Sequence, residues 1–303
     1  MNYISNLHKN FSKSKFVITA EIGPPKNSDK NIIIKKGKML KNFADAFNIT
    51  DNQTAVVRMS SISASKILLD NNIEPIMQIT CRDRNRIGIQ SDLLGASALG
   101  IKNVLCLTGD HQSFGNHPNA KGVFDIDSIQ LIDIVKNMRD NGIFQNGEEI
   151  LNIKPKFYIG AAVNPFLNIN EFKFNRLEKK IEAGADFIQT QSVFNINKFN
   201  IWMDEIRSRG LHKKIHILAG ITPIKSKKMA NRMKYNVPGV DFPDKIFNRL
   251  NKTKNPEKEG YNIALELINE IKNINGIHGI HITALFWENI IPDLVINSNL
   301  RFR

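Results

Sequence analysis

The run Leu105-Cys106-Leu107-Thr108-Gly109-Asp110-His111 decides how we interpret the fold. It continues an apolar stretch from Lys102, and a short apolar run without polar alternation is typical of a parallel strand that is covered on both faces. Gly109 breaks the run, and Asp110 and His111 then deliver a carboxylate and an imidazole. Ligands bind at the carboxyl ends of such strands in barrels and open α/β sheets, so the segment predicts a strand and a site together.

Seven other segments repeat this order of apolar strand, polar turn and helix. The expected strands run over 16–21, 46–50, 75–80, 102–108, 157–163, 186–190, 214–219 and 279–283, and the main helices over 29–43, 60–71, 127–141, 170–183, 195–208, 226–235, 243–252, 256–272 and 287–297. Eight alternations predict an α/β fold, a single (β/α)8 TIM barrel over residues 16–303. A doubly wound open sheet, the alternative, would need a glycine-rich phosphate loop where this chain has Gly23-Pro24-Pro25.

Charge and cysteine content narrow the class of protein. The formal charge is +13, but the lysines spread over the expected helices, where Lys35, Lys36 and Lys38 are expected on a solvated face. This favours attraction for acidic small molecules over nucleic-acid binding, although a basic RNA-associated protein stays open as an alternative. Two cysteines predict no disulfide framework and a reducing compartment.

Targeting signals are weak in this sequence. The apolar runs are too short to cross a bilayer, so no membrane segment is expected. Residues 1–15 lack the apolar centre of a signal peptide, and we expect a frayed leader on a cytoplasmic protein.

Polar side chains follow most of the expected strands. Because the carboxyl ends of all strands meet at one rim of a barrel, these side chains are expected to lie together. They are Glu21, Thr50, Asp51, Asn52, Gln78, Asp110, His111, Asn164, Gln191 and Thr222. Histidines, cysteines and carboxylates at this rim do not have the spacing of metal ligands, so no metal site is predicted.

Glu21 and Asp110 form a candidate acid–base arrangement. A glutamate in an apolar site walled by prolines can have its pKa raised from about 4.3 toward neutrality and act as a general acid. An ionised aspartate could stabilise a developing cation. Each has a plainer alternative: Glu21 as a solvated residue or cap partner, Asp110 as a turn residue, and Gln191 as a satisfied loop amide. Spacing alone therefore predicts a barrel enzyme of undefined reaction.

Motifs at successive strand ends resemble the methylenetetrahydrofolate reductase family from about Phe16 to Leu300. Their order and placement are more specific than any one of them. They are Ala20-Glu21-Ile22-Gly23-Pro24-Pro25, Ile49-Thr50-Asp51-Asn52, Thr80-Cys81-Arg82-Asp83, Leu107-Thr108-Gly109-Asp110-His111, Glu182-Ala183-Gly184-Ala185-Asp186 through Thr190-Gln191, and Gly220-Ile221-Thr222-Pro223 with Val237-Pro238-Gly239.

The resemblance implies a flavin-dependent oxidoreductase of one-carbon metabolism and methionine biosynthesis, which reduces methylenetetrahydrofolate to methyltetrahydrofolate. Hydride would pass from NADH or NADPH through FAD, with FMN as the alternative. Glu21 matches the general acid that protonates a folate nitrogen and opens the ring to an iminium. Asp110 matches the carboxylate beside flavin and pterin, Gln191 an amide that binds the pterin edge, and Thr222 a further substrate contact.

The same resemblance implies which residues contact the cofactor, with Lys180 suited to its phosphates as a point charge. These positions are Thr50, Asp51, Gln78, Thr108, Gly109, Asp110, His111, Asn164 and Lys180. Thr108 and Gln78 stand where better-studied bacterial members have Arg and His. The loop Gly115-Asn116-His117-Pro118 resembles a branch found in acetogens, some members of which work with additional subunits.

We therefore expect methylenetetrahydrofolate as the substrate and a homo-oligomer as the assembly, with no nucleic acid and no membrane among the partners. The alternative function is a flavin- or folate-binding barrel that serves as a subunit of a larger complex and does not itself use NAD(P)H.

Overall fold

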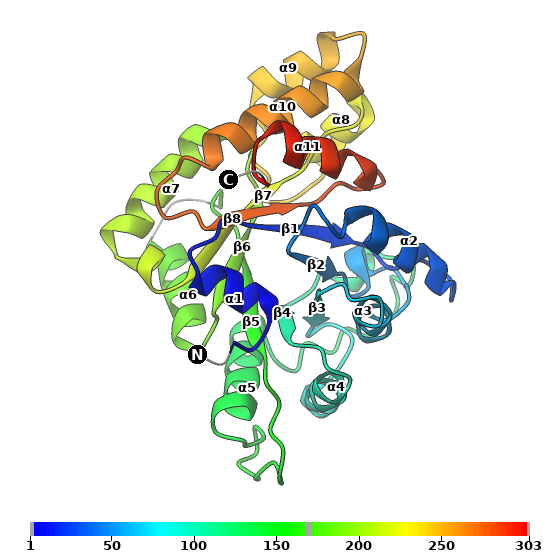
Figure 1. Cartoon of the computed structure of the whole chain (residues 1–303), viewed down its shortest axis with the longest axis vertical. Helices are drawn as coiled ribbons and strands as arrows, with labels where there is room; N and C mark the ends of the chain where they lie inside the picture. The colour runs from blue at the N-terminus through cyan, green and yellow to red at the C-terminus, as the bar shows by residue number, and fades with distance from the viewer. Residues whose placement is uncertain (1–2, 168–170, 302–303) are drawn as a thin grey trace.

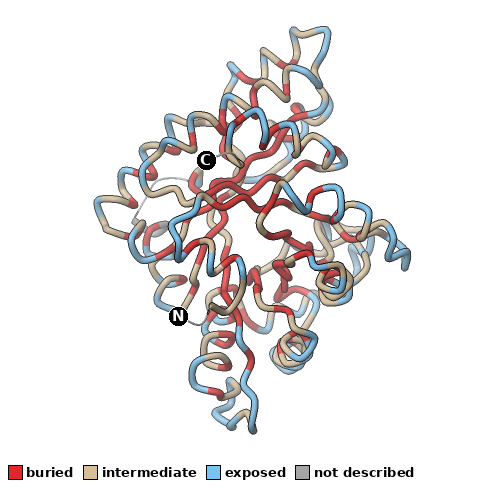
Figure 2. The backbone as a smooth tube through the Cα atoms, viewed as in Figure 1, coloured by how far each residue is buried: buried red, intermediate tan, exposed pale blue. Residues whose placement is uncertain are grey.

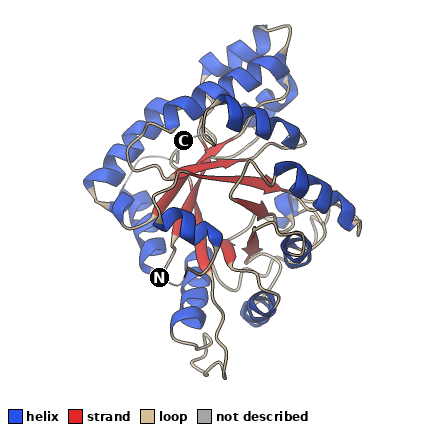
Figure 3. Ribbon diagram, viewed as in Figure 1, coloured by secondary structure: helices blue, strands red, loops and turns tan. Residues whose placement is uncertain are grey.

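Eight parallel strands close into a barrel in the computed structural model, which describes residues 3–167 and 171–301 (Figures 1 and 3). Each strand pairs with the next along the chain, and the last pairs with the first. The strands are β1 Val17–Ile22, β2 Ala46–Ile49, β3 Pro75–Thr80, β4 Asn103–Leu107, β5 Tyr158–Val163, β6 Phe187–Ser192, β7 His216–Ile221 and β8 Gly279–Ile282. The predicted (β/α)8 barrel is confirmed, and every strand begins and ends within two residues of its expected bounds.

Helices follow the strands and surround the barrel (Figure 3). They are α2 Lys30–Leu40, α3 Ser61–Leu69, α4 Arg86–Ala98, α5 Ser128–Asp140, α6 Glu171–Glu182, α7 Ile196–Ser208, α8 Lys227–Tyr235, α9 Asp244–Lys252, α10 Pro256–Ile271 and α11 Ile291–Asn297. The start expected for α6, Asn170, lies outside the described residues. The side chain of Asp127 caps α5 in a capping box with Gln130, which fixes where this helix begins. The closing helix, expected from Trp287, begins instead with a short 3-10 turn over Glu288–Ile290.

Side chains alternate between two faces along each strand. One face points into the barrel, where a buried apolar cluster fills the end at which the strands begin; its strand members are Val17, Ala46, Ile76, Leu105, Tyr158, Phe187 and Leu218. Residues between these, such as Ile18, Phe47 and Met77, pack under the helices, so the strands are buried on both sides (Figure 2). A period of two then determines which later residues of a regular strand also point inward.

The prediction that residues 1–15 form a frayed leader is wrong for the part that the structure describes. Residues Asn6–Ser12 form helix α1, and its Leu7 and Phe11 are buried in the inner cluster beside Tyr158. The carboxylate of Glu74 accepts hydrogen bonds at 3.1 and 2.8 Å from the first two backbone N–H groups of this helix. α1 therefore covers the end of the barrel at which the strands begin. Only two apolar residues at helical spacing, Leu7 and Phe11, become buried in this polar segment, so the sequence pattern does not predict the helix.

A layer of buried polar side chains separates the apolar cluster from the opposite rim. Asn48 and Gln189 exchange two hydrogen bonds between their amides, at 2.6 and 3.0 Å. Thr19 Oγ1 lies 2.9 Å from His281 Nδ1, and burial lowers the pKa of His281 to about 4. These groups satisfy one another inside the barrel, so they hold the strands in register without needing a ligand.

Acid should destabilise this fold through its buried histidines. Burial, with smaller effects from neighbouring imidazoles, lowers the pKa of His216 to about 4, and His281 behaves alike. The unfolded chain, with histidine pKa values of about 6.5, binds more protons between that pH and about 4, so the free energy of unfolding is highest above this window and falls as pH decreases through it.

The His216→Phe variant tests this expectation, since it removes one of the buried imidazoles. Its urea midpoint should fall less than that of the wild-type chain between about pH 7 and about pH 5. The exposed His117→Phe variant should follow the wild type. If the urea midpoints of all three proteins fell equally with decreasing pH, His216 would not resist protonation in the folded chain.

Candidate active site

Four predicted site residues lie on the inward face at the carboxyl ends of their strands. Each stands two or four residues after a member of the inner cluster, as Glu21 stands four residues after Val17, and an even spacing along a strand keeps side chains on one face. These residues are Glu21, Thr50, Gln78 and Thr222. The closed barrel therefore places side chains from four strands at one end, whereas the pocket that contains Glu21 is lined by none of the other predicted site residues.

Glu21 lies in a pocket of about 150 Å³ between β1 and the loops that follow β2 and β8. Its Oε1 accepts a hydrogen bond of 3.0 Å from Gln53 Nε2. Burial raises the pKa of Glu21 to about 7; the Gln53 hydrogen bond opposes this rise, Glu288 adds to it, and Arg58 and Lys36 oppose it. Apolar or backbone walls complete the pocket, among them Gly23, Pro24, Pro25, Ile32, Ala284 and Phe286. A carboxyl that is half protonated near neutral pH can donate a proton to a bound molecule.

Thr50 and Gln78 present polar atoms below this rim. The Thr50 side chain is 1% exposed, and its Oγ1 has no hydrogen-bond partner in the described part of the chain. Gln78 is 8% exposed, and no hydrogen bond of its amide is recorded within residues 3–167 and 171–301. Because buried polar atoms are normally paired, both positions can accept a bound polar molecule.

Gln191 lies at an irregularity of β6. The register of β6 against β7 shifts immediately before Ser192, and bulges of this kind redirect side chains next to active sites. The neighbouring Gly220 permits the close approach, because a Cβ atom there would lie 2.5 Å from a β6 carbonyl oxygen. Thr222 Oγ1 is 2.5 Å from Ser192 Oγ and is therefore tied to the bulged strand.

Asp110 and His111 lie in the exposed segment after β4. Gly109 makes the turn with a φ of +93°, and a Cβ atom there would be 3.1 Å from the Cβ of Thr80, so glycine is required. Arg82 Nη1 donates to the backbone carbonyl of Asp110 at 3.2 Å, whereas the Asp110 carboxylate is exposed and forms no ion pair within the described ranges. His111 bonds to a hydroxyl two residues later. The two candidate catalytic carboxylates therefore differ: Glu21 is partly buried in its pocket, and Asp110 faces solvent.

The other predicted cofactor contacts already have protein partners. Asp51 accepts four hydrogen bonds, two of them from Arg84 at 2.8 and 3.1 Å. Thr108 accepts from the first turn of α5, and Asn164 donates to a carbonyl in the loop after α8. Lys180 Nζ donates to the Ala162 carbonyl at 2.6 Å, and burial lowers its pKa to about 8. These side chains hold the loops of the rim, and their contact with a cofactor stays a prediction.

Several residues that line the Glu21 pocket were not predicted as site residues from the sequence. Lys36, expected on a solvated helix face, forms an ion pair with Glu288 and lines the Glu21 pocket. Ile32 and Lys36 are four residues apart on α2 and both face this pocket, which is the spacing that could have identified them. Gln53 adjoins the Thr50-Asp51-Asn52 motif, but its contact with Glu21 depends on an irregular loop.

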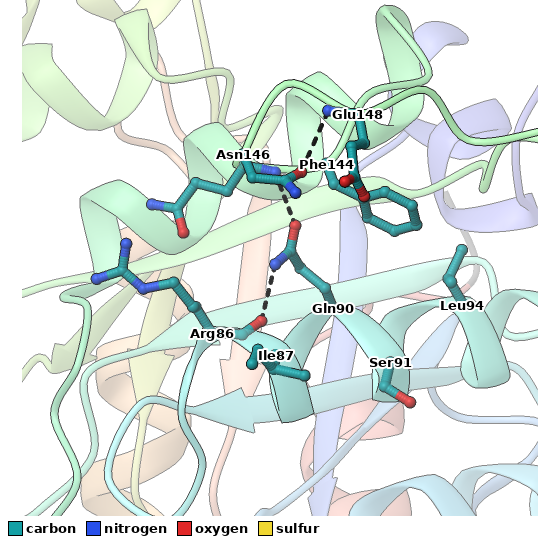
Figure 4. Close-up of a pocket in the computed structure, with 9 residues that line it drawn as sticks. Arg86, Ile87, Gln90, Ser91, Leu94, Phe144, Asn146 and Glu148 are labelled. Atoms are coloured by element: carbon teal, nitrogen blue, oxygen red, sulfur yellow. Dashed lines mark hydrogen bonds between the residues drawn. The ribbon is translucent and has the colours of Figure 1, made fainter.

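A larger groove lies away from the rim, between α4 and the segment around Phe144 (Figure 4). Its volume is about 520 Å³, and Gln90 crosses it by accepting from the Gln145 backbone at 2.8 Å and donating to the Arg86 carbonyl at 2.9 Å. None of the predicted site residues lines it, so the candidate site is the rim.

Residues 3–167 and 171–301 hold neither a cluster of metal ligands nor a helix able to span a membrane. In these ranges no group of three or more histidine, cysteine, aspartate or glutamate side chains is arranged to hold a metal ion. No helix there combines the length and apolar character needed to cross a membrane.

Relatives of known sequence support a common ancestry with folate reductases. Methylenetetrahydrofolate reductase 2 of Schizosaccharomyces pombe is 27% identical over 302 residues, which are 92% of this chain and 45% of that protein. The 5,10-methylenetetrahydrofolate reductase of Buchnera aphidicola subsp. Baizongia pistaciae is 26% identical over 94% of this chain and 92% of its own length. The chain thus spans less than half the length of the fungal relative and nearly all of the bacterial one.

Solved structures agree with the fold. An uncharacterised protein from Clostridium thermocellum that binds two copies of 5-methyl-5,6,7,8-tetrahydrofolic acid has a TM-score of 0.71 at 16% identity, covering 98% of this chain and 99% of its own. At that identity the likeness concerns the fold alone. The family model described as methylenetetrahydrofolate reductase matches residues 6–299, and this chain belongs to that family.

Proposed function

We propose that this protein reduces methylenetetrahydrofolate to methyltetrahydrofolate, with a bound flavin and with NADH or NADPH as the electron donor. The observation that carries the proposal is the Glu21 carboxyl, which is enclosed at a strand end and has a pKa raised by burial to about 7. Family membership and the names of the relatives support the same reaction. The methyltetrahydrofolate bound by the Clostridium thermocellum protein has the chemistry of the proposed product.

Glu21 supplies the proton that the reaction needs. Opening the five-membered ring of the substrate requires protonation of a folate nitrogen, and the products are an iminium cation and the Glu21 carboxylate. Asp110 adds a negative charge at the rim, which favours that cation over the neutral ring. Gln191, at the register shift of β6, is the proposed amide partner of the pterin edge, and Thr222, which bonds to the next residue Ser192, is a further proposed contact.

The rim has features that fit a flavin. When bound, the flavin accepts hydride from the nicotinamide and delivers it to the substrate. Thr50 Oγ1 is buried without a partner, and the Gln78 amide forms no hydrogen bond, among residues 3–167 and 171–301, so both can bond to a polar heterocycle. Whether the cofactor is FAD or FMN depends on its phosphates, for which Lys180 is the proposed contact after release from the Ala162 carbonyl.

The purified protein tests this proposal directly. It should show the absorbance of oxidised flavin, lose it on addition of a reduced nicotinamide, and regain it with methylenetetrahydrofolate. The mass of the released cofactor separates FAD from FMN. A colourless protein that takes up neither would contradict the proposal, whereas a bound flavin that NADH and NADPH cannot reduce would indicate a subunit of a larger complex.

The Asp110→Asn variant should raise the flavin midpoint potential and slow the reoxidation by folate by about tenfold, because it removes a negative charge that destabilises reduced flavin and stabilises the substrate cation. A redox titration and stopped-flow reoxidation measure the two effects. Asp204→Asn on α7, an exposed carboxylate that is not among the predicted site residues, is the control. An unchanged potential would place the Asp110 charge away from the cofactor.

A further inference from the structure

The Glu21 carboxyl accepts a hydrogen bond from the side chain of Gln53. Its Nε2 donates to Oε1 at 3.0 Å, while the oxygen of the same amide lies toward Gly23, where a Cβ atom would be 3.8 Å from it. No hydrogen bond to Glu21 Oε2 is recorded for the described residues, although this oxygen shares the enclosed pocket. The two carboxyl oxygens therefore have different environments.

The loop that carries Gln53 is held in an unusual backbone conformation. Asn52, Thr54 and Ala55 have φ values of +45°, +56° and +54°, which are uncommon for residues with side chains. Such conformations persist only where surrounding contacts impose them, and they are frequent at functional sites. The position of Gln53 is thus set by its neighbours rather than by local preference.

Contacts within the loop and from two other segments impose that conformation. Asn52 Oδ1 accepts from the Arg58 backbone at 3.1 Å, and the Asn52 carbonyl accepts from the buried Arg82 at 3.2 Å. The loop after β4 packs directly on top, because a Cβ atom at Gly115 would lie 1.7 Å from the Ala55 carbonyl oxygen. The same loop begins at Asp110, and its Asn116 Oδ1 accepts from the Val57 backbone at 3.1 Å, so the loop after β4 supports the segment that carries Gln53.

We propose that Gln53 is a positioning residue for the Glu21 acid: by donating to Oε1 it makes that oxygen the acceptor and leaves the transferable proton on Oε2. During transfer the Oε2–H bond breaks, an N–H bond forms on the folate nitrogen, and the Gln53 N–H stabilises the carboxylate left behind. The inference rests on the proposed role of Glu21 as general acid. Gln53 also limits how far burial raises the pKa of Glu21, because it favours the charged form.

Other charged groups around Glu21 set the background against which Gln53 acts. Glu288 raises the pKa of Glu21, whereas Arg58 and Lys36 lower it, and Lys36 is itself paired with Glu288. All three stay in place when only the Gln53 amide is changed. Gln53→Met keeps a similar length but removes the donor, so the pKa of Glu21 should rise by about one unit.

Infrared difference spectra of the protein without substrate measure this shift directly. The carbonyl stretch of protonated Glu21 is identified by its loss in Glu21→Gln, and its titration midpoint is then compared in wild type, Gln53→Met and Gln145→Met. Gln145 is exposed in the groove between α4 and the segment around Phe144, away from Glu21, and serves as the matched control. A higher midpoint only in Gln53→Met is the expected result, and an unchanged midpoint would overturn the inference.

The folate half-reaction gives a second reading. In Gln53→Met its alkaline decline should move upward by the same shift, while its rate on the low-pH plateau falls about tenfold because the proton is no longer held on one oxygen. A loss that is equal at every pH, with no movement of the decline, would indicate a purely structural role. If Glu21→Gln still reduces folate, Glu21 is not the general acid and this inference fails, while the proposed reaction stands. If the infrared midpoint shifts but the wild-type protein does not reduce folate, the proposed function fails and the contact between Gln53 and Glu21 stands.

Discussion

Replacing Glu21 with glutamine should slow the reduction of methylenetetrahydrofolate by orders of magnitude and leave the reduction of bound flavin by nicotinamide nearly intact. Glutamine has the size of glutamate but has no proton to give at neutral pH. General acid catalysis contributes about 10² to 10⁴ in rate, so the folate half-reaction should slow by that factor. Hydride transfer from the nucleotide needs no acid, so the first half-reaction should change little. Stopped-flow spectroscopy follows the two half-reactions separately, as loss and return of flavin absorbance.

The pH dependence of the same half-reaction gives an independent check. Since burial raises the pKa of Glu21 to about 7, the fraction of protonated acid, and with it the rate, should fall as pH rises through that value. Glu148 is an exposed carboxylate in the groove between α4 and the segment around Phe144. The Glu148→Gln variant is therefore the matched control and should leave both half-reactions unchanged. Equal loss of both half-reactions in Glu21→Gln would mean that Glu21 supports cofactor binding rather than proton transfer.

The barrel could be predicted because its signals are local. Strands covered on both faces are short apolar runs, as in Val104 to Leu107, and helix starts carry their own caps, as at Asp127. The helix at residues 6–12 could not be predicted in this way. Its stability comes from Leu7 and Phe11 entering the barrel and from Glu74, whose contacts with the helix span more than sixty positions of sequence.

The candidate site was predictable at its strand ends and not in its loops. Glu21 and Thr50 follow the inward period of regular strands, so their meeting depends on topology alone. Gln53 depends on left-handed residues that no periodic pattern predicts, and Gln191 lies where the register of β6 against β7 shifts. The sequence predicts Lys36 as a surface lysine because its partner, Glu288, lies near the other end of the sequence.

Replacing Phe11 with alanine should destabilise the barrel by about 3–5 kcal/mol, the range typical of buried aromatic side chains that leave a cavity. Phe11 is 3% exposed, and its ring lies 4.5 Å from that of His216 and 6.2 Å from that of Phe187, measured between centroids. The variant removes the apolar contact between α1 and the barrel interior while leaving the Glu74 bonds to the start of the helix. Urea unfolding followed by circular dichroism gives the change in the free energy of unfolding.

Phe114→Ala separates burial from the mere loss of an aromatic ring, because Phe114 is 66% exposed in the loop after β4. Its unfolding free energy should stay within about 0.5 kcal/mol of the wild-type value, as for most surface substitutions. If Phe11→Ala were equally mild, α1 would contribute little to the folded chain, and the inner cluster would have to be stable with its end open to water. The buried ring stack argues against that result, since loss of Phe11 exposes the faces of His216 and Phe187 together.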